Sequence, residues 1–380
     1  MNTQEIIDIE DKYFINTFNR VPIVLDHGEG VKVWDIDGNE YLDFLAGIAV
    51  NCLGHNHPKL VKAIQDQAEK LIHISSIYYN EPATVYAKRL VDATNFDRIF
   101  FANSGAEANE GALKLAIKYS GKHEVLFCGD SFHGRTFLTL SVTDHPEYSA
   151  PYTENLPRGF KKVEFGNLDS VKEAITENTA AIIIEPVQGE GGVHPLNKEF
   201  VQEVVKICNE KDILVIFDEV QCGIGRTGKL FGFNNFDIKP DIVSCAKGLG
   251  AGLPMGAVLC NEKLKDVFNP GDHGSTFGGN PVSCAGALVV LDKLCNENSY
   301  NEINKKGQLI KDLINKANLS NVVEIRGMGL MLGIEIKENS ADIRKKAEEN
   351  GILVLTAGPK VIRLLPPLVI SEDDIKKGIN

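Results

Sequence analysis

The chain lacks the long apolar runs, the basic excess and the paired cysteines that mark several classes of protein. No stretch of about 18 consecutive apolar residues occurs, so we expect no membrane span. The net charge of −12 argues against a nucleic-acid partner. The eight cysteines form no C-x-x-C pair, and several lie in apolar runs, which indicates free thiols in a reducing compartment. The segment 1–12 is acidic and polar, unlike a secretory signal, so we predict a cytoplasmic protein.

Internal repeats and low-complexity segments are also missing, which excludes a solenoid. The length of 380 residues predicts two or three domains. A hydrophobic content of 43% and a charged content of 24% are ordinary for a globular protein. Composition alone therefore favours a large globular protein that acts on small molecules.

Apolar strand-like runs alternate with helical patterns between about residues 80 and 260. The expected strands are 98–102, 124–128, 180–187, 213–217, 242–246 and 255–260. Such alternation predicts the α/β class, with a mostly parallel sheet between layers of helices. Two long helical patterns and several short strands follow, which predict a smaller α+β domain. The expected division is 1–50 for an N-terminal arm and hairpin that pack with the small domain, 51–275 for the large domain and 276–380 for the small domain.

One lysine stands at the end of a buried-strand pattern. Lys247 follows the apolar run 241–246, and glycines that permit close approach come after it. Asp218 ends the preceding strand pattern, one crossover earlier in the chain. The carboxyl ends of strands in open α/β sheets are where ligands bind. An amine and an acid placed there fit a pyridoxal phosphate site, with Lys247 as the Schiff-base lysine and Asp218 facing the pyridine nitrogen. The simpler interpretation is a surface lysine after a strand.

Several other loops follow strands and carry candidate site residues. Ser104, Gly105 and Ala106 open a helix, Ser104 and Glu107 have capping-box spacing, and the free N–H groups there suit a phosphate. The alternative is a plain capped helix.

Aromatic and charged residues occupy the remaining strand-end loops. Phe132 could stack on a flat ring, and Arg135 could bind a carboxylate, although a turn with a surface arginine explains them equally well. Glu190 lies among glycines and is a candidate partner for a cation, or part of a flexible loop. The hydroxyls of Ser275 and Thr276 could reach a phosphate, or belong to a hinge.

The segment 223–230 resembles nucleotide-binding loops without meeting their requirements. Gly223, Gly225 and Gly228 match G-x-G-x-x-G, but Leu230 stands where a phosphate loop needs Ser or Thr, and no helical pattern follows. We therefore expect no nucleotide site. The histidines of the segment 55–57 have no accompanying acidic or cysteine cluster, so we expect no metal site either.

Taken together, these motifs resemble the class III, pyridoxal-phosphate-dependent aminotransferases of the aspartate-aminotransferase fold (fold type I). The matching stretches, in order, are Asn-Ser-Gly-Ala-Glu-Ala-Asn at 103–109, Phe-His-Gly-Arg-Thr at 132–136, Glu-Pro-Val-Gln-Gly-Glu-Gly-Gly at 185–192, Phe-Asp-Glu-Val-Gln at 217–221, Lys247 and Gly-Ser-Thr-Phe-Gly-Gly-Asn-Pro at 274–281. The resemblance covers nearly the whole chain, from about residue 16 to residue 369.

The resemblance implies a role for each cofactor residue. Lys247 would form the Schiff base and move a proton, and Asp218 would keep the pyridine nitrogen protonated. The remaining contacts implied with pyridoxal 5′-phosphate come from Ser104, Gly105, Ala106, Phe132, Val220, Gln221 and, from the neighbouring subunit of a homodimer with shared active sites, Thr276.

The resemblance also implies the substrates. Arg135, with Ser275 close by, would bind the α-carboxylate of N-acetylornithine, and Arg363 would bind a carboxylate of glutamate or 2-oxoglutarate. Glu190 would mask Arg363 when the amino donor has no second carboxylate. Ornithine, succinylornithine and N-succinyl-diaminopimelate are alternative donors. An aminomutase or a decarboxylase on the same fold is less compatible, because a pair of arginines with a masking glutamate suits exchange with a dicarboxylic keto acid. A non-enzymatic regulator would need an added DNA-binding segment, which neither the short acidic N-terminus nor the net charge of −12 supplies.

Overall fold

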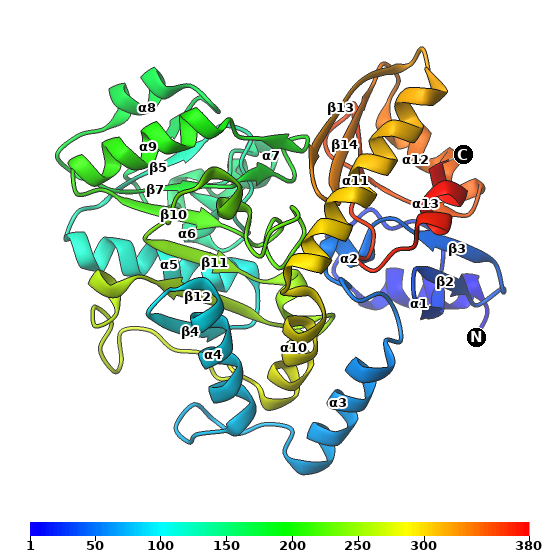
Figure 1. Ribbon diagram of the computed structural model, residues 1–380, viewed down its shortest axis with the longest axis horizontal. Helices are drawn as coiled ribbons and strands as arrows, with labels where there is room; N and C mark the ends of the chain where they lie inside the picture. The colour runs from blue at the N-terminus through cyan, green and yellow to red at the C-terminus, as the bar shows by residue number, and fades with distance from the viewer. Residues whose placement is uncertain (380) are drawn as a thin grey trace.

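The centre of the computed structural model, which describes residues 1–379, is a seven-stranded sheet (Figure 1). Its strand order is β4-β12-β11-β10-β7-β5-β6. The strands are β4 (Arg98–Ala102), β5 (Glu124–Cys128), β6 (Phe160–Val163), β7 (Thr179–Ile184), β10 (Leu214–Asp218), β11 (Ile242–Cys245) and β12 (Gly256–Cys260). The strands from β6 to β11 pair in parallel, whereas β12 is antiparallel to both β11 and β4. The predicted mostly parallel sheet is confirmed.

Two details of the sheet differ from the prediction. The expected strand 180–187 ends at Ile184, because Pro186 has no N–H for the ladder. Its last residues form β8 (Val187–Gln188), which pairs with β9 (His194–Pro195) in a separate hairpin. The edge strand β6 was missed, because Lys161 and Lys162 give it little apolar character.

Helices cover both faces of the large sheet. Alternate residues of β7 belong to different cores: Ala181 and Ile183 pack with α5 (Gly105–Ser120), and Ile182 and Ile184 share a core with α9 (Lys198–Glu210). This alternation follows from the two-residue period of a strand. Further helices of this part are α3 (Pro58–Lys70), α4 (Glu81–Thr94), α6 (Phe137–Leu140), α7 (Pro146–Ser149), η1 (Ala150–Asn155), α8 (Leu168–Ala174), η2 (Gly232–Phe236), η3 (Lys247–Gly250), η4 (Glu262–Leu264) and α10 (Pro281–Leu294).

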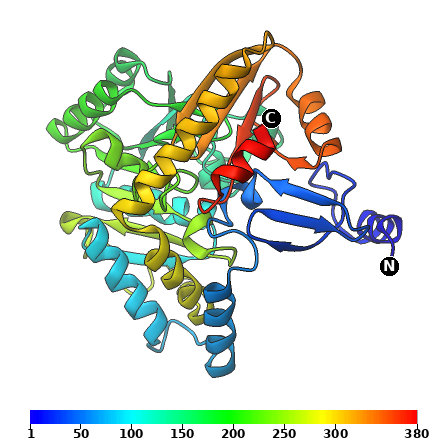
Figure 2. The same ribbon diagram turned by 45° about the vertical axis from the view of Figure 1, so that its right-hand side comes forward.

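The two ends of the chain build the smaller part together (Figures 1 and 2). One sheet has the order β1-β2-β3-β15 and the other the order β13-β14-β17-β16. Their strands are β1 (Leu25–Glu29), β2 (Lys32–Asp35), β3 (Glu40–Asp43), β13 (Val322–Met328), β14 (Met331–Ile336), β15 (Ile352–Leu353), β16 (Leu355–Thr356) and β17 (Val361–Leu364). The helices are α1 (Thr3–Tyr13), α2 (Ala46–Ala49), α11 (Glu297–Ala317), α12 (Ser340–Glu349) and α13 (Glu372–Ile379). The predicted hairpin is β2 with β3, and β3 pairs in parallel with β15.

The helix α10 bears on where the small part begins. It packs mainly against α3 and α4, and α4 contacts β4 of the large sheet. The next helix, α11, packs against α13 and β13 of the smaller part. We therefore propose that the two parts divide between α10 and α11, later than the expected boundary at residue 276.

The glycine-rich segment 223–230 joins the two parts of the chain. Arg226 is 2% exposed, and its Nη1 donates to the carbonyl oxygens of Leu330 at 3.0 Å and Pro366 at 2.6 Å. Gly228 has a positive φ of 80°, which favours glycine, and a Cβ there would also meet the side chain of Asn304. The segment is buried between the two parts except at the partly exposed Lys229.

No helix within residues 1–379 combines the length and the apolar character that are needed to cross a membrane.

We predict that Arg226→Ala lowers the free energy of unfolding by about 3–5 kcal/mol, because it leaves two buried carbonyls without a donor and opens a cavity. Urea denaturation followed by circular dichroism measures the change. Arg158→Ala is the control, since Arg158 is exposed and has no ion pair within residues 1–379; it should change the value by less than about 0.5 kcal/mol. Equal stability of the two variants would contradict the role given to Arg226.

Candidate active site

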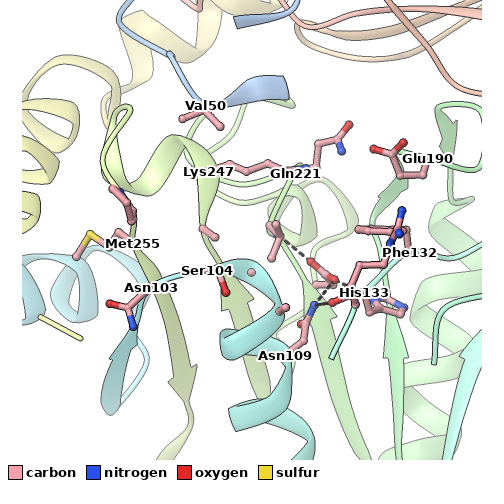
Figure 3. Close-up of a pocket in the computed structure, with 18 of the residues that line it drawn as sticks. Val50, Asn103, Ser104, Asn109, Phe132, His133, Glu190, Gln221, Lys247 and Met255 are labelled. Carbon is pink, nitrogen blue, oxygen red and sulfur yellow. Dashed lines mark hydrogen bonds and ion pairs between the residues drawn. The ribbon is translucent and has the colours of Figure 1, made fainter. Parts of the chain in front are cut away.

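A cavity of about 460 Å³ lies where β10 and β11 end and α5 begins (Figure 3). Most of the predicted site residues line it: Ser104, Gly105, Ala106, Phe132, Arg135, Glu190, Asp218, Val220, Gln221 and Lys247. These residues come from separate loops at the carboxyl edge of the sheet. The tertiary structure therefore brings them together at the place where open α/β sheets bind ligands.

Asp218 is the most constrained group of the cavity. Its side chain belongs to a residue that is 3% exposed. The Oδ2 atom accepts a hydrogen bond from Asn109 Nδ2 at 2.7 Å, and it also lies 2.7 Å from His133 Nδ1. Its Oδ1 atom accepts from the backbone N–H of Val220 at 2.9 Å. The two partners of Oδ2 use both of its lone pairs, whereas Oδ1 retains one, so the group can still accept a hydrogen bond from a ligand at Oδ1.

Asn109 and His133 are functional residues to which the sequence argument gave no role (Figure 3). Asn109 also donates to the carbonyl oxygen of His133 at 2.8 Å and accepts a hydrogen bond from Ser244 of β11. A signal for Asn109 was available, because it follows Gly105 by one helical turn and therefore lies on the same helix face. His133 carried no comparable signal, since its partner is distant in sequence.

Lys247 is the first residue of η3, two residues after the end of β11, and it has a positive φ of 49°. Burial lowers the pKa of its amine; Glu190 partly opposes this shift, and Arg363 reinforces it. Among residues 1–379 no side chain forms an ion pair or hydrogen bond with its Nζ atom. A non-glycine residue in the left-handed region is costly and is commonly found at functional sites. The lysine is thus a half-buried, unpaired amine with an increased neutral fraction.

The N-terminus of α5 forms one wall of the cavity. Ser104 caps the helix by accepting from the N–H of Glu107 at 3.2 Å, as predicted. In a capping box the side chain of Glu107 would accept a hydrogen bond from the backbone N–H of Ser104. Here it accepts instead from the backbone N–H of Asn103, at 2.9 Å. A Cβ at Gly105 would lie 2.7 Å from Val220 Cγ1, so glycine is required where the helix approaches this wall. The first N–H groups of the helix remain available to an anion.

Arg363 of β17 contacts Glu190, which lines the cavity. Its guanidinium donates to both carboxylate oxygens of Glu190, at 2.7 and 3.2 Å, and to Gln221 Oε1 at 3.1 Å. Burial would raise the pKa of Glu190, but the charge and hydrogen bonds of Arg363 outweigh it and lower that pKa. A second arginine of the smaller part, Arg326, donates to the carbonyl oxygen of Gly192 at 2.9 Å. The loop that carries Glu190 is thus held at two points.

Three predicted residues, Ser275, Thr276 and Arg363, do not line this cavity. Ser275 and Thr276 line a separate cavity of about 440 Å³, which shares Asn103 with the first. Asn103 Nδ2 donates to Ser275 Oγ at 3.0 Å. Ser275 and Arg135 thus line different cavities of the same chain.

Two buried acids were also missed by the sequence argument. Glu185 accepts from the backbone N–H groups of Phe132 and Gly189, each at 3.0 Å, and burial raises its pKa from 4.5 to about 7. Glu219 accepts from the N–H groups of Gly232 and Phe233 at 2.8 and 2.7 Å, and burial raises its pKa from 4.5 to about 8. Both acids hold the loops around the site.

A family model described as aminotransferase class-III matches residues 14–380 of this chain. An acetylornithine aminotransferase of Methanocaldococcus jannaschii is 47% identical, and the match covers 100% of this chain and 97% of that protein. The crystal structure of acetylornithine aminotransferase from Elizabethkingia anophelis is similar with a TM-score of 0.89 at 36% identity, covering 100% of this chain and 97% of that one. An ornithine aminotransferase structure from Toxoplasma gondii, described as having partial occupancy of PLP at the active site, has a TM-score of 0.93 at 32% identity, covering 100% and 93%.

We predict that Glu219 makes the protein less stable as the pH rises from about 4.5 to about 8. In that interval the unfolded chain has lost the Glu219 proton and the folded chain still holds it, so raising the pH favours unfolding, by up to about 1.4 kcal/mol per pH unit. The free energy of unfolding, measured across this interval for the wild type and Glu219→Gln, should fall more steeply in the wild type. Parallel curves would show that Glu219 ionises normally in the folded protein.

Proposed function

This chain belongs to the class-III aminotransferase family, and we propose that it transfers the terminal amino group of N2-acetyl-L-ornithine to 2-oxoglutarate. The products are N-acetyl-L-glutamate 5-semialdehyde and L-glutamate, and the reaction is a step of arginine biosynthesis. The observation that carries the proposal is that an unpaired, half-buried amine, Lys247, lines one cavity with Arg135 and Glu190, and that Glu190 pairs with Arg363 behind the cavity wall. Similarity over the full chain to an acetylornithine aminotransferase supports the choice of donor.

The cavity fits pyridoxal 5′-phosphate in its donor set. An anion-binding helix start, an aromatic side chain, a buried carboxylate with spare acceptor capacity and an unpaired amine all face it. When bound, the cofactor supplies an aldehyde that condenses with amines and a ring that withdraws electrons. The residues that would hold it are Ser104, Gly105 and Ala106 at the phosphate, Phe132 and Val220 at the ring faces, Gln221 at the ring hydroxyl, Asp218 at the ring nitrogen and Lys247 at the aldehyde carbon.

Lys247 is the residue that moves the proton. Only a neutral amine can accept a proton at Nζ, and burial increases the neutral fraction by lowering its pKa. The absence of a carboxylate partner within residues 1–379 leaves Nζ free to turn between positions. Asp218 is held by Asn109, His133 and the Val220 N–H, so it presents an acceptor in one fixed orientation.

The two arginines explain how one cavity serves two different substrates. N-acetylornithine has one carboxylate, which Arg135 would bind bidentately. 2-Oxoglutarate has two, and the second would bind Arg363 after Glu190 turns away. With the monocarboxylate donor, Glu190 keeps Arg363 neutralised by the pair seen at 2.7 and 3.2 Å.

The protein would act as a homodimer with shared active sites. Ser275 and Thr276 lie outside the main cavity of their own chain, which supports a role for them in the cavity of a partner. The cysteines within residues 1–379 are all free, and most are buried, which supports a cytoplasmic location.

Ornithine is the second candidate donor, favoured by the similarity to an ornithine aminotransferase structure. Succinylornithine shares the terminal amine and the α-carboxylate of N-acetylornithine. N-succinyl-diaminopimelate has its free amine beside a further carboxylate, but it keeps the carboxylate next to the acylated nitrogen, so both also suit the Arg135 arrangement.

We predict that the purified protein, supplied with pyridoxal phosphate and 2-oxoglutarate, forms glutamate fastest from N-acetylornithine. Glutamate release measures this rate for each of the four donors. Lys247→Ala is the control and should reduce turnover by at least about a thousandfold, because it removes both the Schiff-base amine and the proton carrier. A faster rate with another donor would replace the donor assignment, and no turnover with any donor would refute the proposed reaction.

We predict that Glu190→Ala shifts the donor preference towards glutamate. The change frees Arg363 for a second carboxylate and leaves it unpaired with N-acetylornithine, so the ratio of kcat/KM for glutamate to that for N-acetylornithine should rise about tenfold or more. Each half-reaction is followed separately by stopped-flow absorbance. Glu190→Gln keeps the size and one acceptor, and it should shift the ratio less. An unchanged ratio in both variants would exclude masking by Glu190.

A further inference from the structure

Arg135 is held in a different way from Arg363. It is exposed, and no ion pair or hydrogen bond joins its side chain to the other described residues, 1–379. Its guanidinium carbon instead lies 3.5 Å from the centre of the Tyr148 ring and 5.5 Å from that of Phe132. A cation over the face of a tyrosine ring is attracted by the π-electrons without being neutralised.

Tyr148 is itself fixed by neighbouring aromatic rings. In α7 it stacks on His145, with ring centres 5.2 Å apart and planes at 26°. Its ring meets Phe132 edge-on at 6.3 Å and 90°. We call Phe132, His145 and Tyr148 the aromatic cluster. Since Phe132 lines the main cavity, the aromatic cluster connects the wall of that cavity to the support of Arg135.

The stacked arrangement leaves the arginine ready for a ligand. The N–H donors of a guanidinium lie in its plane, so a ring against one face occupies none of them. A carboxylate partner would have taken the same donors, as Glu190 does for Arg363. Tyr148 also lines an adjoining cavity of about 610 Å³ that shares Glu190 with the first, so it stands beside the substrate path.

We propose that Tyr148 is a positioning residue that orients Arg135 for the carboxylate of the amino donor. This inference rests on the proposed function, in which Arg135 binds that carboxylate. Tyr148 limits the rotation of the arginine before substrate arrives, and so reduces the conformational entropy that binding would otherwise cost. It does so without the competing charge that must be displaced at Arg363.

The test compares Tyr148→Leu, which removes the ring, with Tyr148→Phe, which retains it. The hydroxyl of Tyr148 forms no hydrogen bond to residues 1–379, so the phenylalanine variant is a matched control. Each is assayed with N-acetylornithine and with N-acetylputrescine, the same amine without the carboxylate. For N-acetylornithine, Tyr148→Leu should lower kcat/KM by about 2- to 30-fold, chiefly by raising KM. This fold-change corresponds to the range of energies found for cation–π interactions. The same variant should leave kcat/KM for N-acetylputrescine unchanged, and Tyr148→Phe should match the wild type with both.

Introducing Tyr148→Leu into Arg135→Met separates positioning from simple packing. If Tyr148 acts through Arg135, the second substitution has no further effect on N-acetylornithine. The proposal would be overturned if Tyr148→Leu lowered kcat/KM equally for both amines. It would also be overturned if Tyr148→Leu lowered kcat/KM for N-acetylornithine as much in the Arg135→Met variant as in the wild type.

A binding measurement separates this proposal from the donor assignment. Calorimetry with N-acetyl-L-norvaline, which has the carboxylate but no terminal amine, should show Tyr148→Leu weakening binding and Tyr148→Phe preserving it. That result upholds the proposal even if the wild type prefers another donor, and unchanged binding in Tyr148→Leu would refute it even if N-acetylornithine is the donor.

Discussion

The buried carboxylate of Asp218 is the constraint on which the rest of the site depends. A charge 3% exposed is costly unless it is hydrogen-bonded, and here its partners come from three separate elements. Asn109 belongs to α5, His133 to the loop after β5, and the N–H of Val220 to the turn after β10. Satisfying one carboxylate therefore places the start of α5, Phe132 and the end of β10 around one cavity. Through Ser244, Asn109 also reaches β11, which leads directly into Lys247.

The smaller part of the chain completes this frame with two arginines. Arg363 forms an ion pair with Glu190, and Arg326 donates a hydrogen bond to the carbonyl of Gly192, so both arginines bind the same loop of the large part. A third buried arginine, Arg226, extends from the large part to carbonyls of the smaller part. These contacts join the two parts through directional hydrogen bonds. Under the proposed function, only the pair of Arg363 with Glu190 would have to open for a dicarboxylate, because only that pair would compete with a substrate group.

Much of the fold was predictable because its signals are local. Apolar runs and capping residues indicated the central strands and α5 without knowledge of their neighbours. The prediction failed at Pro186, which ends β7 early, and at β6, whose lysines hide an edge strand. The division that we propose between α10 and α11 has no local signal, because α10 is apolar on most sides and its partners α3 and α4 lie more than a hundred residues away.

The sequence by itself determined the chemistry of the site: a lysine and an aspartate at strand ends, a helix start for a phosphate, and the ordered motifs of the class-III aminotransferases. Those features depend on residue type and short spacing, which a linear pattern records. Only the tertiary structure decided that Asn109 and His133 hold Asp218, that Tyr148 supports Arg135, and that Ser275 and Thr276 lie outside the cavity of their own chain. Most of these relations join residues from different elements of the fold, and even where the residues are close in sequence, no linear pattern records how their side chains meet in space.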